Sequence, residues 1–247
     1  GVVQGDQSGD LALERACTYQ EAMVMAQRLI LAVYDANDAG SKGLLWKAVN
    51  GSNTLYLLGT IHLDRDNVYP LHKSLRQALY SAQKVAFELD FNDTDGMAEF
   101  VAMQTYADGS ALKDHISPAL YERVSAALKA LDMTQEQIDT YKPWALANAF
   151  SSLATLDETS GENAMAIDLY VNAKAVNAGI HIGAVETYAF QGQIFDTLSP
   201  EYQEQYLAGG LLLILDPDSI SQETRDALTE VLGEDAFQPE TQEAIQA

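Results

Sequence analysis

Residues 55–62 read Leu-Tyr-Leu-Leu-Gly-Thr-Ile-His, and this stretch decides the predicted fold. A short apolar run bounded by turn signals is typical of a buried strand, and Gly59 lets the backbone turn sharply where that strand ends. His62 then lies just past the carboxyl end of the strand, in the loop that leads to a helix. Ligands of open α/β sheets bind at that edge, so the stretch predicts a functional histidine.

Two further apolar runs end on carboxylates. Residues 84–90 read Lys-Val-Ala-Phe-Glu-Leu-Asp, and residues 179–186 read Gly-Ile-His-Ile-Gly-Ala-Val-Glu. A helix between the first run and residues 84–89 makes a βαβ unit, whose strands are parallel. We therefore predict that His62, Glu88 and Glu186 meet at one sheet edge.

An imidazole and two carboxylates are suitable ligands for a divalent ion such as Mn, Zn or Co. A catalytic ion keeps one open position for water, which it makes more acidic. Because Glu88 lies inside an apolar run, we expect it to be buried and therefore neutral, paired or bound to metal. The structural alternatives are a hydrogen-bonding His62, a solvated Glu88 and a helix-capping Glu186. Asp90 is either a second ligand or a cap.

The fold class predicted for the whole chain is α/β, with a mixed, largely parallel sheet flanked by helices. Residues 1–40 are expected to form a helical appendage, and residues 41–247 the α/β domain, with a helical insertion at about 92–160. Asn50-Gly51 between two apolar runs predicts a hairpin.

Several helix boundaries follow from proline and glycine. Pro70 should open a helix that ends near Ala82, and Ser199-Pro200 should cap and start another. Gly179 should end the helix at 164–178. His72 is expected at the surface.

The composition of the chain excludes several classes of partner and structure. The chain has 247 residues, is 47% hydrophobic, and carries 14 basic against 36 acidic residues, a net charge of −22. That charge disfavours nucleic acid and anionic membranes as partners. No apolar run approaches the roughly 18 residues of a membrane span. The one cysteine, Cys17, excludes an intramolecular disulfide framework.

The predicted helix at 14–34 contains a second signal. Residues 15–29, Arg-Ala-Cys-Thr-Tyr-Gln-Glu-Ala-Met-Val-Met-Ala-Gln-Arg-Leu, resemble the closing helix of a surface-layer homology module. Such modules attach exported bacterial proteins to the cell wall. The alternative, which we favour, is an ordinary amphipathic helix.

Six short motifs, in order, resemble the TraB/GumN family, which includes the TIKI proteases. They extend over about residues 44–207: Tyr56–His62, Tyr69–Leu71, Ala86–Asp90, Lys142–Trp144, Ala166–Tyr170, and Val185–Thr187 with Gln191. The resemblance implies a fold like that of the erythromycin esterase and ChaN proteins. TIKI members are metal-dependent peptidases in which the Gly-x-x-His motif and a glutamate matter.

By that resemblance His62 is a metal ligand or catalytic residue, and Glu88 and Glu186 are ligands or the general base. Asp168 and Gln191 are further candidates. One departure puts catalysis in doubt: the family has a second Gly-x-x-His near its carboxyl terminus, and no histidine follows Gln191 here. Either that half of the site is lost, or the chain stops short of it.

The leading hypothesis is a metal-dependent hydrolase, a TIKI-like peptidase with a peptide or protein substrate. It would be extracellular or at the bacterial cell surface, with the cell wall as a further partner. The alternatives are an inactive binding module on the same fold and, by analogy with ChaN, a haem- or iron-binding protein. A shared fold does not choose among them.

Overall fold

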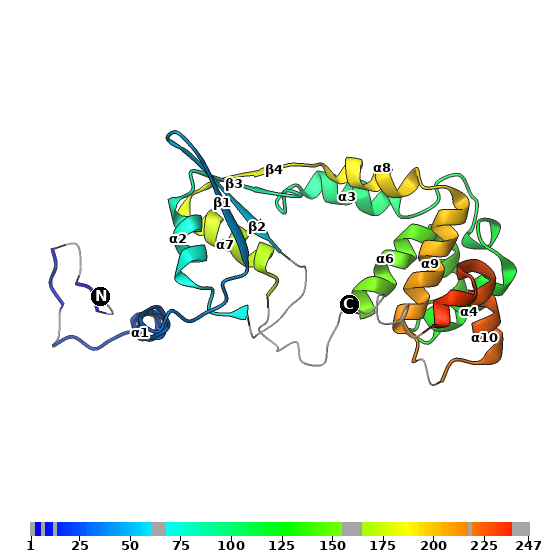
Figure 1. The fold of residues 1–247 in the computed structure, drawn as a ribbon, viewed down its shortest axis with the longest axis horizontal. Helices are drawn as coiled ribbons and strands as arrows, with labels where there is room; N and C mark the ends of the chain where they lie inside the picture. The colour runs from blue at the N-terminus through cyan, green and yellow to red at the C-terminus, as the bar shows by residue number, and fades with distance from the viewer. Residues whose placement is uncertain are drawn as a thin grey trace. The chain divides into compact units, whose positions relative to one another are not determined.

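The Asn-Gly pair closes a β-hairpin, as predicted. In the computed structural model, which describes residues 3–5, 8–11, 14–60, 68–154, 165–216 and 219–238, β1 (Leu44–Asn50) pairs antiparallel with β2 (Asn53–Gly59). Gly51 takes a positive φ of 60° at the turn, a conformation that glycine adopts without strain. In Figure 1 the tip of the hairpin projects beyond α2 (Lys73–Ser81).

Two units are separated by the pattern of contacts. The first comprises Gly1–Val85 with Thr159–Ile182, and the second comprises Ala86–Glu158 with Gly183–Ala247. This division groups residues by their contacts and does not test whether residues 1–40 form an appendage, so the boundary near residue 40 stays a prediction. No helix among the described residues is long and apolar enough to cross a membrane.

The first unit packs α2 (Lys73–Ser81) on α7 (Ile167–Ala178), and the two helices lie side by side in Figure 1. Leu75 and Ala78 on α2 are buried, as are Val171 and Ala175 on α7. The apolar faces of both helices are thereby removed from water, which is the main favourable term in folding. As predicted, α7 ends at Gly179, which has the left-handed φ of 65°.

The start of α2 corrects two predictions. The helix begins at Lys73 rather than at Pro70, because His72 is its N-cap and accepts a hydrogen bond from the Ser74 backbone N–H. His72 is 5% exposed, so the surface position predicted for it is wrong. Its Nε2 lies 3.2 Å from an Asp38 carboxylate oxygen. Lys73 also binds Asp38, and these partners lower the pKa of the Asp38 carboxyl.

The amino-terminal helix α1 (Tyr19–Ala36) has a capping box. Thr18 accepts from the Glu21 backbone N–H, and the Glu21 carboxylate accepts from the Thr18 N–H. Arg15 and Thr18 together lower the pKa of Glu21 to about 2. No residue of α1 is buried. The helix therefore owes its start to local hydrogen bonds rather than to packing.

A second two-stranded sheet pairs β3 (Lys84–Phe87) with β4 (His181–Ala184). Within the described residues β2 pairs only with β1, so the parallel pairing predicted between residues 54–58 and 84–89 is not found there. The protein is a mixed α/β structure, as predicted, but the largely parallel sheet is not confirmed. The strands that were expected to share one sheet lie in two small ones.

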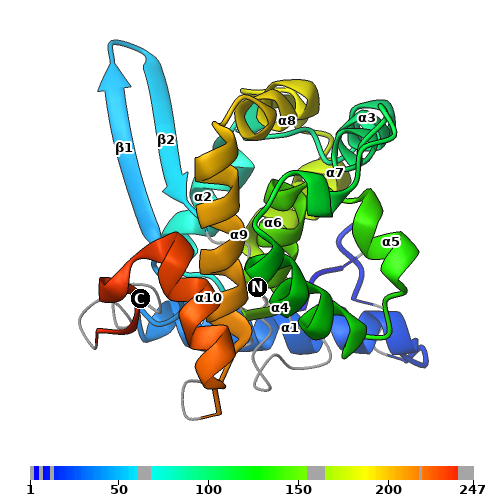
Figure 2. The ribbon, with the colours of Figure 1, turned by 90° about the vertical axis from the view of Figure 1, so that its right-hand side faces the viewer.

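Helices dominate the second unit, and the assignment of residues 92–160 as an insertion stays a prediction. Its α-helices are α3 (Thr94–Met103), α4 (Pro118–Lys129), α5 (Gln135–Thr140), α6 (Pro143–Ala154), α8 (Tyr188–Asp196), α9 (Pro200–Ile214) and α10 (Gln222–Leu232). Short 3-10 turns lie at Leu112–Asp114 and Glu234–Phe237. Ser199 caps α9 with Pro200 at its start, as predicted. Figure 2 shows α6 and α9 side by side, flanked by α4 and α10.

The contact between α6 and α9 requires a glycine. A Cβ built on Gly210 would lie 3.0 Å from the Ala147 carbonyl oxygen and 3.1 Å from its Cα, both backbone atoms of α6. The neighbouring Gly209 has nothing within 4 Å. The two helix backbones therefore approach closely at one glycine and leave open space at the other.

The different surroundings of Gly210 and Gly209 predict opposite effects of alanine substitution on stability. Gly210→Ala should destabilise the protein by about 1–2 kcal/mol, because overpacking against backbone outweighs the gain in helix propensity. Gly209→Ala should stabilise it by about 0.5–1 kcal/mol, because only the propensity gain remains. Urea unfolding of both variants measures the two effects. A stabilising Gly210→Ala would contradict the close approach of the helices.

Candidate functional site

The segments that follow β3 and β4 bring two glutamates together. The Val185 N–H donates to the Phe87 carbonyl oxygen at 2.9 Å, and the Glu186 N–H donates to the Glu88 carbonyl oxygen at 3.0 Å. The residue numbers rise together along both segments, which is the sense of a parallel pair. Glu88 and Glu186 thus lie opposite each other where the two strands end, as predicted.

Gln191 binds both carboxylates. Its Nε2 donates to Glu88 Oε1 at 2.5 Å and to Glu186 Oε2 at 3.3 Å. Thr187 caps the first turn of α8 through a bond from the Phe190 N–H at 3.1 Å, and this fixes the helix turn that carries Gln191. Two carboxylates held this close repel each other, and an amide N–H₂ shared between them offsets part of that repulsion.

The burial expected for Glu88 is wrong. Glu88 is exposed and Glu186 is half-buried. The apolar run around Glu88 suggested burial, but the described neighbours leave its side chain open to solvent. A solvated carboxylate can reach a substrate or an ion without a large desolvation cost.

Asp90 has a local structural role. Its Oδ1 accepts from the Asn92 backbone N–H at 2.9 Å and from Asn92 Nδ2 at 3.0 Å. Asp93, not Asp90, caps α3, through a bond from the Gly96 N–H. The cap role left open for Asp90 is therefore wrong, and its role as a second ligand stays a prediction.

Two other predicted residues are not joined to this pair by any described contact. His62 falls within residues 61–67, outside the described residues, so its predicted place beside the glutamates stays a prediction. Asp168 is buried on α7, at 4% exposure, in the first unit. Among the described residues no three His, Cys, Asp or Glu side chains are arranged to hold a metal ion.

The side chains of this cluster fit a divalent ion in part. Glu88 and Glu186 offer carboxylate oxygens that converge on one nitrogen, and hard oxygen ligands suit ions such as Mn. The Gln191 amide nitrogen, a partly positive donor, sits where the two oxygens converge. A cation placed there would therefore meet two ligands of the right chemistry, and it would have to replace the amide donor or bind its carbonyl oxygen.

One polar cluster of the second unit was missed in the sequence. Lys142 Nζ donates to Asp196 at 2.8 and 2.9 Å, and Trp144 Nε1 donates to Asp196 Oδ1 at 2.7 Å. The Lys-Pro-Trp motif marked two of these residues, but no local signal marked Asp196. Asp196 could not be identified from the sequence as their partner, because it ends α8, more than 50 residues further along the chain.

Comparison with known proteins gives one match. The sequence model of the TraB/PrgY/gumN family matches residues 44–243. No curated protein and no solved structure matches the chain. The match includes Glu88, Glu186, Gln191 and the Lys-Pro-Trp motif, and it begins at the first residue of the hairpin.

Proposed function

The chain belongs to the TraB/PrgY/gumN family, and on that premise we propose that it is a metal-dependent hydrolase that cleaves peptides. The observation that carries the proposal is the convergence of Glu88 and Glu186 on the Gln191 amide at a shared strand end. The peptide substrate comes from the resemblance to TIKI-type members, and so does the location outside the cell or on its surface.

In this proposal His62, Glu88 and Glu186 hold a divalent cation such as Mn, Zn or Co. The cation would supply positive charge that acidifies a water molecule and polarises a carbonyl group. Glu88 takes the proton of the attacking water, because it is the more exposed of the two glutamates. Glu186 stays fixed beside the capped start of α8.

Gln191 orients both carboxylates in the proposed site. Each bond from its amide ties one oxygen of a glutamate, which leaves the second oxygen of each carboxylate for other contacts. Holding two acids in one geometry before the substrate arrives removes part of the entropy cost of the reaction.

A second candidate function is a binding module without catalysis. The Gln191 amide donates to both carboxylates, so a protein group already bridges the pair without an ion. That observation favours a structural role for the cluster in a family member that no longer hydrolyses its ligand.

A metal and peptide assay separates the two. Purified protein is dialysed against Mn, Zn and Co, its bound metal is measured, and a peptide library is digested with and without chelator. We expect bound metal, cleavage that chelator abolishes, and at least a tenfold loss of bound metal in His62→Ala. Equal metal in both proteins would remove His62 from the ligands. Inactivity with every metal at high protein concentration would favour the binding module.

A further inference from the structure

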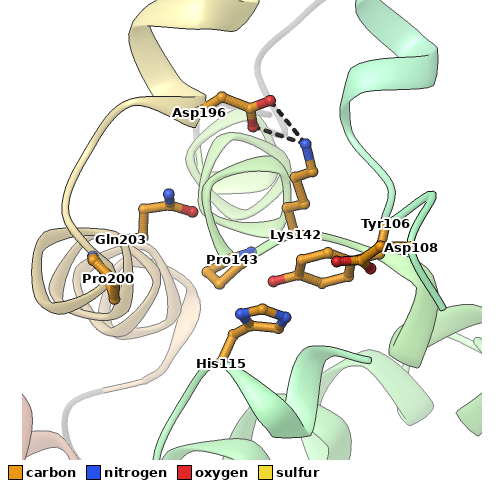
Figure 3. Close-up of a pocket in the computed structure, with 8 residues that line it drawn as sticks. All are labelled: Tyr106, Asp108, His115, Lys142, Pro143, Asp196, Pro200 and Gln203. Carbon is orange, nitrogen blue, oxygen red and sulfur yellow. Dashed lines mark hydrogen bonds and ion pairs between the residues drawn. The ribbon is translucent and has the colours of Figure 1, made fainter. Parts of the chain in front are cut away.

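A hollow lies in the second unit, and neither Glu88 nor Glu186 is among its lining residues. Its volume is about 300 Å³, and Tyr106, His115, Lys142, Pro143, Asp196 and Gln203 are among its lining residues (Figure 3). A hollow of this volume is at the lower end of the range for small-ligand sites. It therefore has room for one side chain of a peptide.

Backbone pairing builds one wall of the pocket. The Tyr106 N–H donates to the Thr140 carbonyl oxygen at 3.0 Å, and the Lys142 N–H donates to the Gln104 carbonyl oxygen at 2.9 Å. These bonds flank an antiparallel bridge between Thr105 and Tyr141. Tyr106 and Lys142 are thus placed by main-chain hydrogen bonds rather than by mobile side-chain contacts.

The one lysine of the pocket is already neutralised. Lys142 pairs with Asp196, whose side chain also accepts from the Trp144 indole N–H. Figure 3 shows Lys142 turned toward Asp196 along one edge of the hollow. The ammonium group is therefore engaged, and an anionic ligand would have to break this pair to bind it.

Asp108, a further lining residue, keeps an uncompensated negative charge. Hydrogen bonds from the Ser110 N–H and hydroxyl group lower the pKa of the Asp108 carboxyl. No lysine or arginine pairs with it in the described ranges of the chain. His115 lies near, with its Nε2 at 2.9 Å from the Ser110 hydroxyl and its ring stacked on Tyr106. With a neutral imidazole the pocket has a net charge of −1.

Gln203 and Tyr106 each offer an oxygen that can accept a hydrogen bond. The Gln203 amide nitrogen donates to the Leu198 carbonyl oxygen at 3.1 Å, so its own carbonyl oxygen is left for another donor. In Figure 3 that oxygen and the Tyr106 hydroxyl both point into the hollow. The Tyr106 hydroxyl has no hydrogen-bond partner among the described residues, and burial raises its pKa, so it stays protonated.

We propose that this pocket binds the side chain of a lysine or arginine in a peptide. The cation would pair with the exposed Asp108, and the oxygens of Gln203 and Tyr106 would accept from other N–H groups of the ligand. Its aliphatic stem would lie on Pro143, and an acidic ligand would meet Asp108 without a free cation to balance it. This inference does not depend on the proposed hydrolase, since it needs neither metal nor the two glutamates.

Titration with small amides tests the pocket. N-acetyl-lysinamide and N-acetyl-argininamide are added at about pH 8, where an ordinary imidazole is neutral, and N-acetyl-citrullinamide serves as the uncharged isostere. The readout is the indole N–H resonance of Trp144, which lies beside the pocket; Trp46 is the internal control. We expect saturable binding of the two cations on the order of 1 mM, and no shift of Trp46.

Asp108→Asn is the decisive variant. Asparagine keeps the oxygen that accepts from the Ser110 N–H, so the turn should survive while the charge is lost. We expect binding to weaken by about tenfold or more. Glu230→Gln makes the same charge change at an exposed position of α10 and should leave binding unchanged. Equal binding of the citrulline amide, equal affinity of Asp108→Asn, or no Trp144 shift would each overturn the proposal.

Discussion

Glu186→Gln should lower metal-dependent peptide cleavage by at least ~100-fold, and Glu88→Gln should lower it as much or more. Glutamine is nearly isosteric with glutamate, so the packing beside α8 is kept. It lacks the negative charge that holds a cation and the basicity that accepts a proton. Initial rates with saturating metal measure the loss, and bound metal measured in parallel separates weaker binding from a lost base.

The control for this prediction is Glu99→Gln. Glu99 is exposed on α3, in the same unit, and the substitution removes the same charge from a protein of net charge −22. The cleavage rate of this variant should stay within about twofold, because an exposed, solvated charge is screened. A Glu99→Gln loss as large as that of Glu186→Gln would point to overall charge rather than to the proposed site.

The two variants should also differ in whether they lose bound metal together with peptide cleavage. If Glu88 accepts the proton, Glu88→Gln should keep part of its bound metal while losing cleavage. Glu186→Gln should lose both together, because the half-buried Glu186 is assigned to holding the ion. Full metal content in Glu186→Gln would reverse the two assignments.

Local signals in the sequence predicted local structure well. The Asn-Gly turn, the Ser199-Pro200 helix start and the left-handed Gly179 each depend on the conformational preference of one or two residues. Such preferences act over a few residues and need no knowledge of distant neighbours. The helices α4 and α6 begin at Pro118 and Pro143, and a proline at a helix start is a local signal of the same kind.

Long-range pairing was predicted only in part. The approach of Glu88 to Glu186 followed from equivalent positions at two strand ends, and backbone hydrogen bonds join their segments. The prediction puts β2 and β3 in one parallel sheet, yet in the described residues β2 pairs with β1 and β3 pairs with β4. Apolar runs indicate that a strand exists, but they carry little information about which strand lies beside it.

Side-chain burial was the least predictable property. Glu88 lies in an apolar run and is exposed, whereas the polar His72 is 5% exposed and caps a helix. In both cases the outcome depends on neighbours distant in sequence, such as Asp38 beside His72. The role of Gln191 was underestimated for the same reason, since its two carboxylate partners are recognised only once the strands are paired.

Trp144→Ala should destabilise the protein by about 3–5 kcal/mol, the largest stability effect that we expect. Trp144 is fully buried, stacks on Phe195 with ring centroids 5.1 Å apart, and lies 5.7 Å from the Phe100 ring. Truncation removes both ring contacts and leaves a cavity that the surrounding α-helices can fill only in part. Urea unfolding followed by far-ultraviolet circular dichroism measures the change.

The conservative variant separates packing from hydrogen bonding. Trp144→Phe keeps an aromatic ring against Phe195 but loses the indole N–H that donates to Asp196 at 2.7 Å. Asp196 retains its pair with Lys142, so this variant should cost only about 1–2 kcal/mol.

The matched control is the other tryptophan of the chain. Trp46 is 57% exposed on β1, and Trp46→Ala should cost less than about 1 kcal/mol, because an exposed side chain leaves no cavity. A Trp46→Ala loss equal to that of Trp144→Ala would contradict this assignment of the core. If Trp144→Ala costs the most stability, Trp144→Phe less and Trp46→Ala least, then Trp144 both supports the helical core and holds Asp196 in place beside the pocket proposed for a basic side chain.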